Sequence, residues 1–261
     1  MKPEIFVNLS FDHLSNEDLD FLAIQGLHPE LYFSADHIDN LTEEHRRRIL
    51  GELKNRGFRP SLHAPFYDLN SGAHDSKLRA IALERLNWAL DAAQAFRADQ
   101  IVCHPGHGPW VLGRQFPNWL ERARKTLSEV VKRAGELNLR IAFENIYDTD
   151  PADLLELLRA FPEKHVGFCF DLGHFNLFSQ AAMKVWLDAL GPRLFECHIH
   201  DNLGAEDDHI AIGDGNVNFC PLVQWLKIQP GLPRLTLEME QKTHVIKSVA
   251  RIREWFAPAP E

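Results

Sequence analysis

The chain has 261 residues, and its composition, 45% hydrophobic and 25% charged, is that of a folded globular protein rather than a disordered or fibrous one. The formal net charge of −9 gives no general attraction to nucleic acid or to an anionic membrane surface. No run of about 18 apolar residues is present, so we expect no membrane span.

Short apolar runs alternate along the chain with longer amphipathic segments, which predicts strands alternating with helices. The expected strands are residues 5–10, 30–34, 59–65, 100–105, 140–145, 165–171, 194–201 and 234–240. The expected helices are residues 16–23, 43–56, 76–96, 118–137, 152–160, 180–190, 220–228 and 245–256. This alternation, over a length close to the about 250 residues typical of the fold, predicts an α/β protein with a single (β/α)8 TIM barrel as one domain over residues 1–261.

Side chains that bind metals recur where these expected strands end, and two more follow in a loop. They are His63, His104, Glu144, Asp171, His174, His198, Asp207, His209 and Glu238. The carboxyl ends of all strands meet at one face of such a barrel, so we expect a metal site there. Mixed nitrogen and oxygen ligands suit Zn, Mn, Co or Fe, and the set is larger than one ion needs. We therefore expect one to about three divalent ions.

The alternation of side chains along the strands supports this placement, because neighbouring residues of a strand face opposite sides. Small or polar residues share the face of the ligands and are expected inside the barrel: Ala142, Gly167, Cys169, Glu196 and Thr236. Large apolar residues such as Phe195, Cys197 and Ile199 are expected to face the helices.

These motifs resemble the xylose-isomerase-like TIM-barrel superfamily, which contains sugar isomerases and epimerases together with endonuclease IV. The resemblance covers essentially the whole chain. It rests on His63-Ala-Pro, His104-Pro-Gly, Glu144-Asn, Asp171-Leu-Gly-His174, His198-Ile-His-Asp, Asp207-Asp-His209 followed by Gly213-Asp-Gly215, and Glu238 in Leu-Thr-Leu-Glu.

The two branches of the superfamily imply different uses of the same ligands. The endonuclease IV branch implies three zinc sites, which are His63, His104 and Glu144; Glu144, Asp171, His198 and Glu238; and His174, Asp207 and His209. The epimerase branch implies one ion, often manganese or cobalt, on the second of these sets. In that branch Glu144 and Glu238 also exchange protons with the substrate, and His174 contacts it.

The favoured function is isomerisation or epimerisation of a small carbohydrate, that is a sugar, a sugar phosphate or a related polyol, through an enediolate. Glu144 and Glu238 lie on the fifth and eighth expected strands, at opposite sides of the barrel mouth. One would remove the proton next to the carbonyl and the other would return one, which makes them the expected catalytic residues. An acidic, compact chain without a nucleic-acid-binding module favours this role in carbohydrate metabolism.

An endonuclease IV-like multi-zinc phosphodiesterase, acting on abasic-site DNA, is the alternative, because all the ligand types that it needs are present. The acidic segments 35–40 and 204–208 make a nucleic-acid partner unlikely, since a phosphate backbone attracts Arg and Lys. A non-catalytic metal-binding barrel is a minor alternative, and ligands at the catalytic face of the barrel argue against it.

Five further residues beside strand ends are candidate substrate contacts: Phe66, His107, Trp110, Asn145 and His200. Loop packing is the competing interpretation for His107 and Trp110, and a strand-end cap for Asn145. His200 can instead orient a metal ligand from behind.

The four cysteines form no CxxC pair, and residues 1–8 lack the long apolar stretch of a signal peptide. We therefore expect a cytoplasmic protein in a reducing environment. The sequence does not define an oligomeric state.

Overall fold

The computed structural model describes residues 3–108 and 115–257, and its strands close into a barrel in chain order. The strands are β1 (Ile5–Ser10), β2 (His28–Tyr32), β3 (Ser61–His63), β4 (Gln100–Cys103), β5 (Arg140–Glu144), β6 (Val166–Asp171), β7 (Leu194–Ile199) and β8 (Arg234–Leu237). Each strand pairs in parallel with the next, and β8 pairs with β1. The barrel expected from the sequence is confirmed.

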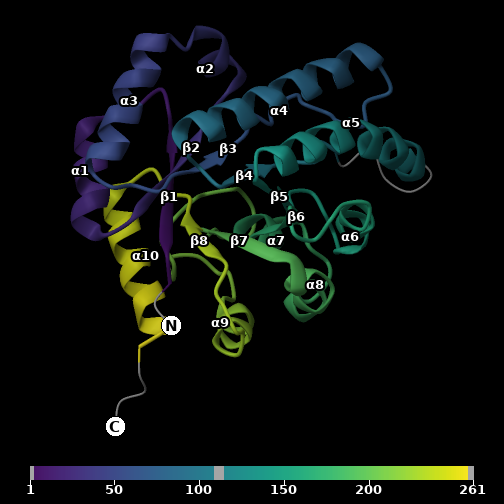
Figure 1. Cartoon of the computed structure of the whole chain (residues 1–261). Coiled ribbons are helices and arrows are strands. Elements are labelled where there is room, and N and C mark those ends of the chain that lie inside the picture. Colours follow the sequence, from purple (N-terminus) through teal and green to yellow (C-terminus); the bar gives the residue numbers. More distant parts are fainter. Residues whose placement is uncertain (1–2, 109–114, 258–261) are drawn as a thin grey trace.

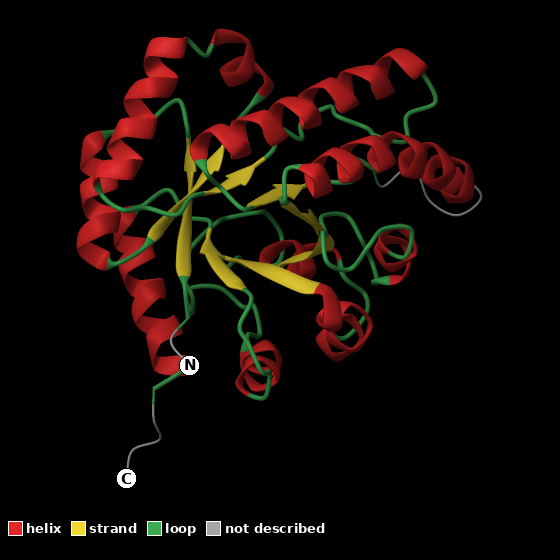
Figure 2. Ribbon diagram, viewed as in Figure 1, coloured by secondary structure: helices red, strands yellow, loops and turns green. Residues whose placement is uncertain are grey.

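The helices lie around the outside of the barrel (Figure 1, Figure 2). They are α1 (Asn16–Gln25), α2 (Ala35–Asn40), α3 (Glu43–Asn55), α4 (Ser76–Phe96), α5 (Phe116–Glu136), α6 (Ala152–Leu158), α7 (Leu172–Phe178), α8 (Met183–Leu190), α9 (Cys220–Lys227) and α10 (Lys242–Trp255). Every helix expected from the sequence is present within a few residues of its expected bounds. Within the described ranges, none of them has the length and apolar character that crossing a membrane requires.

Two short helices, α2 and α7, were not expected from the sequence. The Ser34 hydroxyl accepts the backbone N–H of His37, and this capping box starts α2 in the segment expected as an acidic loop. The Asp171 carboxylate accepts the backbone N–H of His174 at 2.6 Å and starts α7 in the same way. Asp171 therefore fixes the direction of the chain at the point where it also enters the predicted metal site.

The inward faces of the strands form a polar layer beneath the barrel mouth. Its buried members are Glu30, Ser61, Gln100, Glu196 and Thr236. A TIM-barrel interior is more often filled by Val, Ile and Leu, so this layer is unusual. It is internally paired, since Gln100 and Thr236 both donate to the Glu196 carboxyl group.

Phe195 corrects one expectation, because its side chain lies inside the barrel rather than against the helices. It packs on Val102, Ala142 and Cys169, and it covers Gly167 so closely that a Cβ there would lie 2.5 Å from the ring. The pairing of β6 with β7 shifts at this level, which places Phe195 and Glu196 on the same side. A strict two-residue alternation misses such a shift. Cys197 and Ile199 face the outer core, as expected.

The buried carboxyl group of Glu196 makes the stability of the barrel depend on pH. Burial raises its pKa from 4.5 to about 8. The barrel therefore holds a proton that the unfolded chain releases, and stability falls as the pH rises from 4.5 towards 8. Glu196→Gln removes this loss, and the hydroxyl of Thr236 can turn to accept from the new amide.

We expect Glu196→Gln to raise the free energy of unfolding near pH 8 by on the order of 2–4 kcal/mol, and by much less near pH 5. Urea unfolding of both proteins at the two pH values measures the difference. A gain that is equal at both pH values, or larger near pH 5, contradicts the raised pKa.

Candidate metal centre

The predicted ligands all meet at the carboxyl ends of the strands, and they divide into three groups. Group A is His63, His104 and Glu144; group B is Glu144, Asp171, His198 and Glu238; group C is His174, Asp207 and His209. In groups A and B, one ligand atom from each member lies within 4.8 Å of the others. The structure brings these nine side chains to one face of the barrel, and metal binding by them stays a prediction.

Group A is built around a single carboxylate oxygen. Nε2 of His63 lies 3.2 Å from Oε2 of Glu144, and Nε2 of His104 lies 3.3 Å from the same oxygen. All three side chains are almost completely buried. β3, β4 and β5 are neighbours in the barrel, so their ends bring these residues together without help from long loops.

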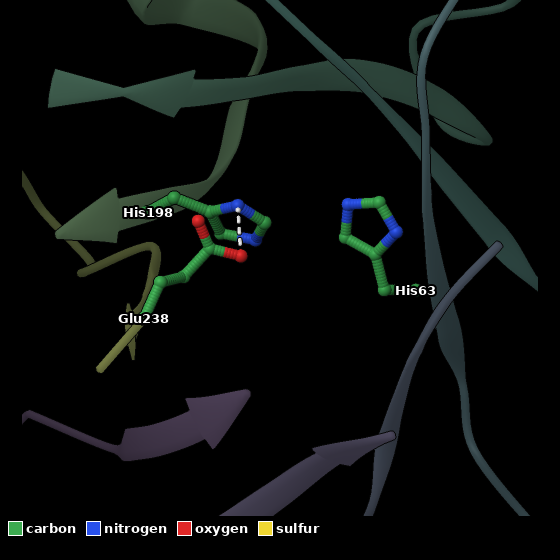
Figure 3. A group of neighbouring side chains, drawn as sticks. All are labelled: His63, His198 and Glu238. Atoms are coloured by element: carbon green, nitrogen blue, oxygen red, sulfur yellow. Dashed lines mark ion pairs between the residues drawn. The ribbon is translucent and has the colours of Figure 1, made fainter. Parts of the chain in front are cut away.

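Group B shares Glu144 with group A and adds the ends of β6, β7 and β8. Nδ1 of His198 lies 3.3 Å from Oε2 of Glu144 and 3.2 Å from Oε1 of Glu238. Figure 3 shows the His198 ring and the Glu238 carboxylate side by side, with the His63 ring facing them from the other side. Asp171 approaches His198 Nδ1 to 4.0 Å. Glu144 is thus the link between the two groups.

Group C lies nearer to the protein surface. Oδ2 of Asp207 is 3.3 Å from Nε2 of His174 and 3.1 Å from Nε2 of His209. Asp207 and His209 come from the loop after β7 and are partly exposed, whereas His174 is mostly buried at the start of α7.

Three of the histidines have their second ring nitrogen held by a backbone carbonyl. Nδ1 of His63 lies 2.9 Å from the carbonyl oxygen of Ala64. Nδ1 of His174 lies 3.0 Å from the carbonyl oxygen of Asn145, and Nδ1 of His209 lies 2.8 Å from that of Glu238. A carbonyl only accepts, so each Nδ1 carries a proton, and Nε2 is the nitrogen that would bind a metal ion in each group. The rings are therefore oriented as metal ligands are.

The donor atoms fit divalent ions. Both ring nitrogens of His198 are buried and have no hydrogen-bond partner in the described part of the chain, although carboxylate oxygens lie close to each of them. Buried carboxylates at this spacing repel one another unless a cation lies between them. Imidazole nitrogen with carboxylate oxygen suits Zn, Mn, Co or Fe.

The two glutamates of group B have opposite pKa shifts. Burial alone raises the pKa of Glu144, but the surrounding imidazoles of His104, His198 and His174 outweigh it and hold this pKa well below its ordinary value. Burial raises the pKa of Glu238, and the nearby carboxylate of Glu144 adds to the rise. Burial also lowers the pKa of His104 to about 4, which keeps that ring neutral and able to bind a metal at neutral pH.

His200 lies behind the ligands and connects groups B and C. Its Nε2 donates to Oδ2 of Asp171 at 3.2 Å, and its ring stacks on His209 with centroids 3.9 Å apart. Gly173 makes room for it, because a Cβ at that position would lie 1.9 Å from the His200 ring. The glycine of the Asp171-Leu-Gly-His174 motif thus has a steric reason.

Gly173→Ala is expected to displace His200, with a loss of stability of about 1–3 kcal/mol from overpacking. Gly51→Ala is the matched control, because a Cβ there meets nothing within 4 Å in the middle of α3. The control is expected to raise stability by about 0.5–1 kcal/mol. Urea unfolding of the two variants measures both effects, and a Gly173→Ala protein as stable as the wild type contradicts this packing.

The candidate substrate contacts lie in different surroundings. Phe66 is half-buried at the rim of group A, with its ring centroid 4.6 Å from that of His104. His107 is buried and pairs with Asp148 at 3.0 Å. Both amide atoms of Asn145 bond to the backbone of Asp171. Trp110 lies outside the described residues. Substrate binding by these residues and by His200 stays a prediction.

Sequence reasoning missed two residues at the base of the site, Asn8 and Glu30. Asn8 Nδ2 donates to Oε1 of Glu30 at 3.0 Å and to Oε1 of Glu238 at 3.1 Å. Glu30 is fully buried in the middle of β2. Burial alone raises its pKa, but His198 outweighs burial and lowers this pKa to about 2. A glutamate within an expected strand, on the face that points into the barrel, was the feature of the sequence that could have identified Glu30 as part of the site.

Comparison with known proteins gives consistent matches over nearly the full length. The profile of the family described as xylose isomerase-like TIM barrel matches residues 17–258. The uncharacterized protein MJ1311 of Methanocaldococcus jannaschii is 30% identical over 202 residues, which are 75% of this chain and 69% of that protein.

Two solved structures share the whole fold. The TTHB071 protein from Thermus thermophilus, from a crystal soaked with ZnCl2, matches with a TM-score of 0.82 and 26% identity, covering 97% of this chain and 98% of that one. A D-tagatose 3-epimerase-like protein matches with a TM-score of 0.83 and 25% identity, covering 97% and 96% of the two chains.

Proposed function

Because the chain belongs to the xylose isomerase-like TIM barrel family, we propose that it is a divalent-metal-dependent isomerase or epimerase of a sugar or related polyol. The reaction moves a proton at the carbon next to a carbonyl, through an enediolate. The similarity to a D-tagatose 3-epimerase-like protein supports a carbohydrate substrate.

The observation that carries the proposal is the placement of two glutamates beside one imidazole, with Glu144 3.3 Å and Glu238 3.2 Å from Nδ1 of His198. Their opposite pKa shifts agree with different roles. Glu144, with the lowered pKa, is ionised and suited to accept a proton. Glu238, with the raised pKa, is suited to hold a proton and return it. Two carboxyl groups whose environments separate their pKa values are the usual arrangement for acid and base roles in one site.

Group B would hold the ion, through Glu144, Asp171, His198 and Glu238. When bound, a divalent ion lowers the cost of the developing enediolate charge by polarising the substrate oxygens. Asn8 fixes one oxygen of Glu238 by donating to it, which leaves the other oxygen for proton transfer.

The aromatic residues beside group A suit the apolar face of a sugar ring. Phe66 packs between Tyr67 and His104, and Tyr32 packs on both His63 and Phe66. Among the described ion pairs and hydrogen bonds, Lys and Arg side chains make none with groups A, B and C. A substrate without a phosphate group fits these surroundings better than a charged one.

The test is a panel of ketoses and aldoses incubated with the protein and manganese, cobalt or zinc, with products separated by chromatography. We expect conversion of at least one ketose into its epimer or isomer, and loss of that conversion when a chelator removes the metal. Failure with every sugar under every metal contradicts the proposal.

The second candidate is a multi-zinc phosphodiesterase, and the geometry of group C favours it. An epimerase that uses one ion in group B has no need of the Asp207 carboxylate between two imidazole nitrogens. Cleavage of DNA at an abasic site by the zinc-loaded protein, without conversion of any sugar, would establish this alternative in place of the first.

A further inference from the structure

We propose that Glu30, buried beneath the site on β2, is a positioning residue that sets the proton and the orientation of the His198 ring. The inference rests on the metal dependence in the proposed function. It assigns a role to the polar layer under the barrel mouth, which the reaction itself does not use.

The two nitrogens of His198 face different partners. Nδ1 faces the carboxylates of group B, and Nε2 lies 3.2 Å from Oε1 of Glu30. Both His198 and Glu30 are completely buried, so water does not compete for either. The Nε2 contact is an ion-pair distance and not a formed hydrogen bond in the described part of the chain. When a metal ion takes Nδ1, the ring proton belongs on Nε2, beside the Glu30 carboxylate.

The other histidines show why this contact differs from ordinary packing. In His63, His174 and His209 a neutral backbone carbonyl holds the second nitrogen. In His198 a carboxylate takes that place. A charged acceptor makes the imidazole a stronger donor to a metal than a neutral carbonyl does. The strength of His198 as a metal ligand therefore depends on a side chain, that of Glu30, and not on a backbone carbonyl.

Glu30 is itself held by neighbours. Ser61 Oγ donates to Oε2 of Glu30 at 3.0 Å, and Asn8 Nδ2 donates to Oε1 at 3.0 Å. The same Asn8 amide donates to Glu238 at 3.1 Å. Glu30 thus connects two ligands of group B, His198 directly and Glu238 through Asn8. A buried carboxylate is costly unless it is paired, and this arrangement pairs it with ligands of the site.

The experiment compares two isosteric changes in the same interior layer, Glu30→Gln and Glu196→Gln. Glu196 bonds to Gln100 and Thr236 and has no hydrogen bond or ion pair with the three groups in the described structure. Zinc affinity is measured by competition with a chromogenic chelator, and the metal-free proteins are unfolded in urea. We expect Glu30→Gln to weaken zinc binding by about 10–100-fold and Glu196→Gln by less than about threefold.

The two readouts separate positioning from a structural role. A Glu30→Gln protein that is less stable without metal but binds zinc as the wild type does overturns the proposal, as does an equal loss of affinity in both variants. A wild-type chain without measurable zinc affinity overturns it too. If the chain converts no sugar, the proposed function fails, while the zinc comparison still decides the role of Glu30.

Discussion

Glu238→Gln is expected to lower kcat/KM on the substrate sugar by at least about 1,000-fold while leaving the barrel folded. The amide has the size of the carboxyl group, and it can still accept the hydrogen bond from Asn8. It cannot hold and return a proton, and it is a weaker metal ligand than a carboxylate. Both losses act on the chemical step, so the effect exceeds that of removing a simple binding contact.

The matched control is Glu240→Gln, two residues further along the chain, where the side chain is exposed. It carries the same change of charge and is expected to turn over as the wild type does. Steady-state kinetics and circular dichroism on both variants measure the two effects. Turnover near the wild-type rate in Glu238→Gln would rule out both enzymatic hypotheses for this site.

Glu144→Gln is expected to remove the ions of both group A and group B, because its carboxylate belongs to both. Oε2 of Glu144 is within 3.3 Å of a nitrogen of His63, His104 and His198. Asp207→Asn is the comparison, since Asp207 belongs to group C alone. We expect it to lose the ion of group C and to keep the others.

Mass spectrometry of metals in dialysed, zinc-loaded proteins measures this difference directly. Where all three groups bind zinc, the wild-type chain holds about three ions, Asp207→Asn about two, and Glu144→Gln about one, while the proposed epimerisation requires only the ion of group B. Equal metal contents in the two variants would contradict the assignment of Glu144 as the shared ligand. About one ion in the wild type would confine binding to group B and favour the epimerase over the phosphodiesterase.

The barrel and the convergence of the predicted ligands follow from the sequence because both depend on simple periodic rules. A strand fixes which residues share a face, and a closed parallel barrel brings the strand ends together. Each of the ligands on β3 to β8 follows from those two rules. Asp207 and His209 lie in a loop, so their place in the site came from the resemblance to the superfamily rather than from periodicity.

What the sequence did not reveal depends on contacts between distant segments. Glu30 shows this, because only the closure of β2 near β7 brings it beside His198. The inward side chain of Phe195 required a shift in the pairing of β6 with β7. Helix α7 depends on Asp171 acting as a cap, a role that its place among the predicted ligands does not reveal.

The incorporation of solvent deuterium into a ketose tests the central claim most directly. In deuterium oxide with saturating metal, proton transfer at the carbon next to the carbonyl exchanges that hydrogen, and NMR spectroscopy detects the exchange even when little product accumulates. We expect exchange by the wild-type protein, and none by Glu238→Gln or after chelation of the metal. No exchange in any ketose of a broad panel would contradict metal-dependent proton transfer as the function of this barrel.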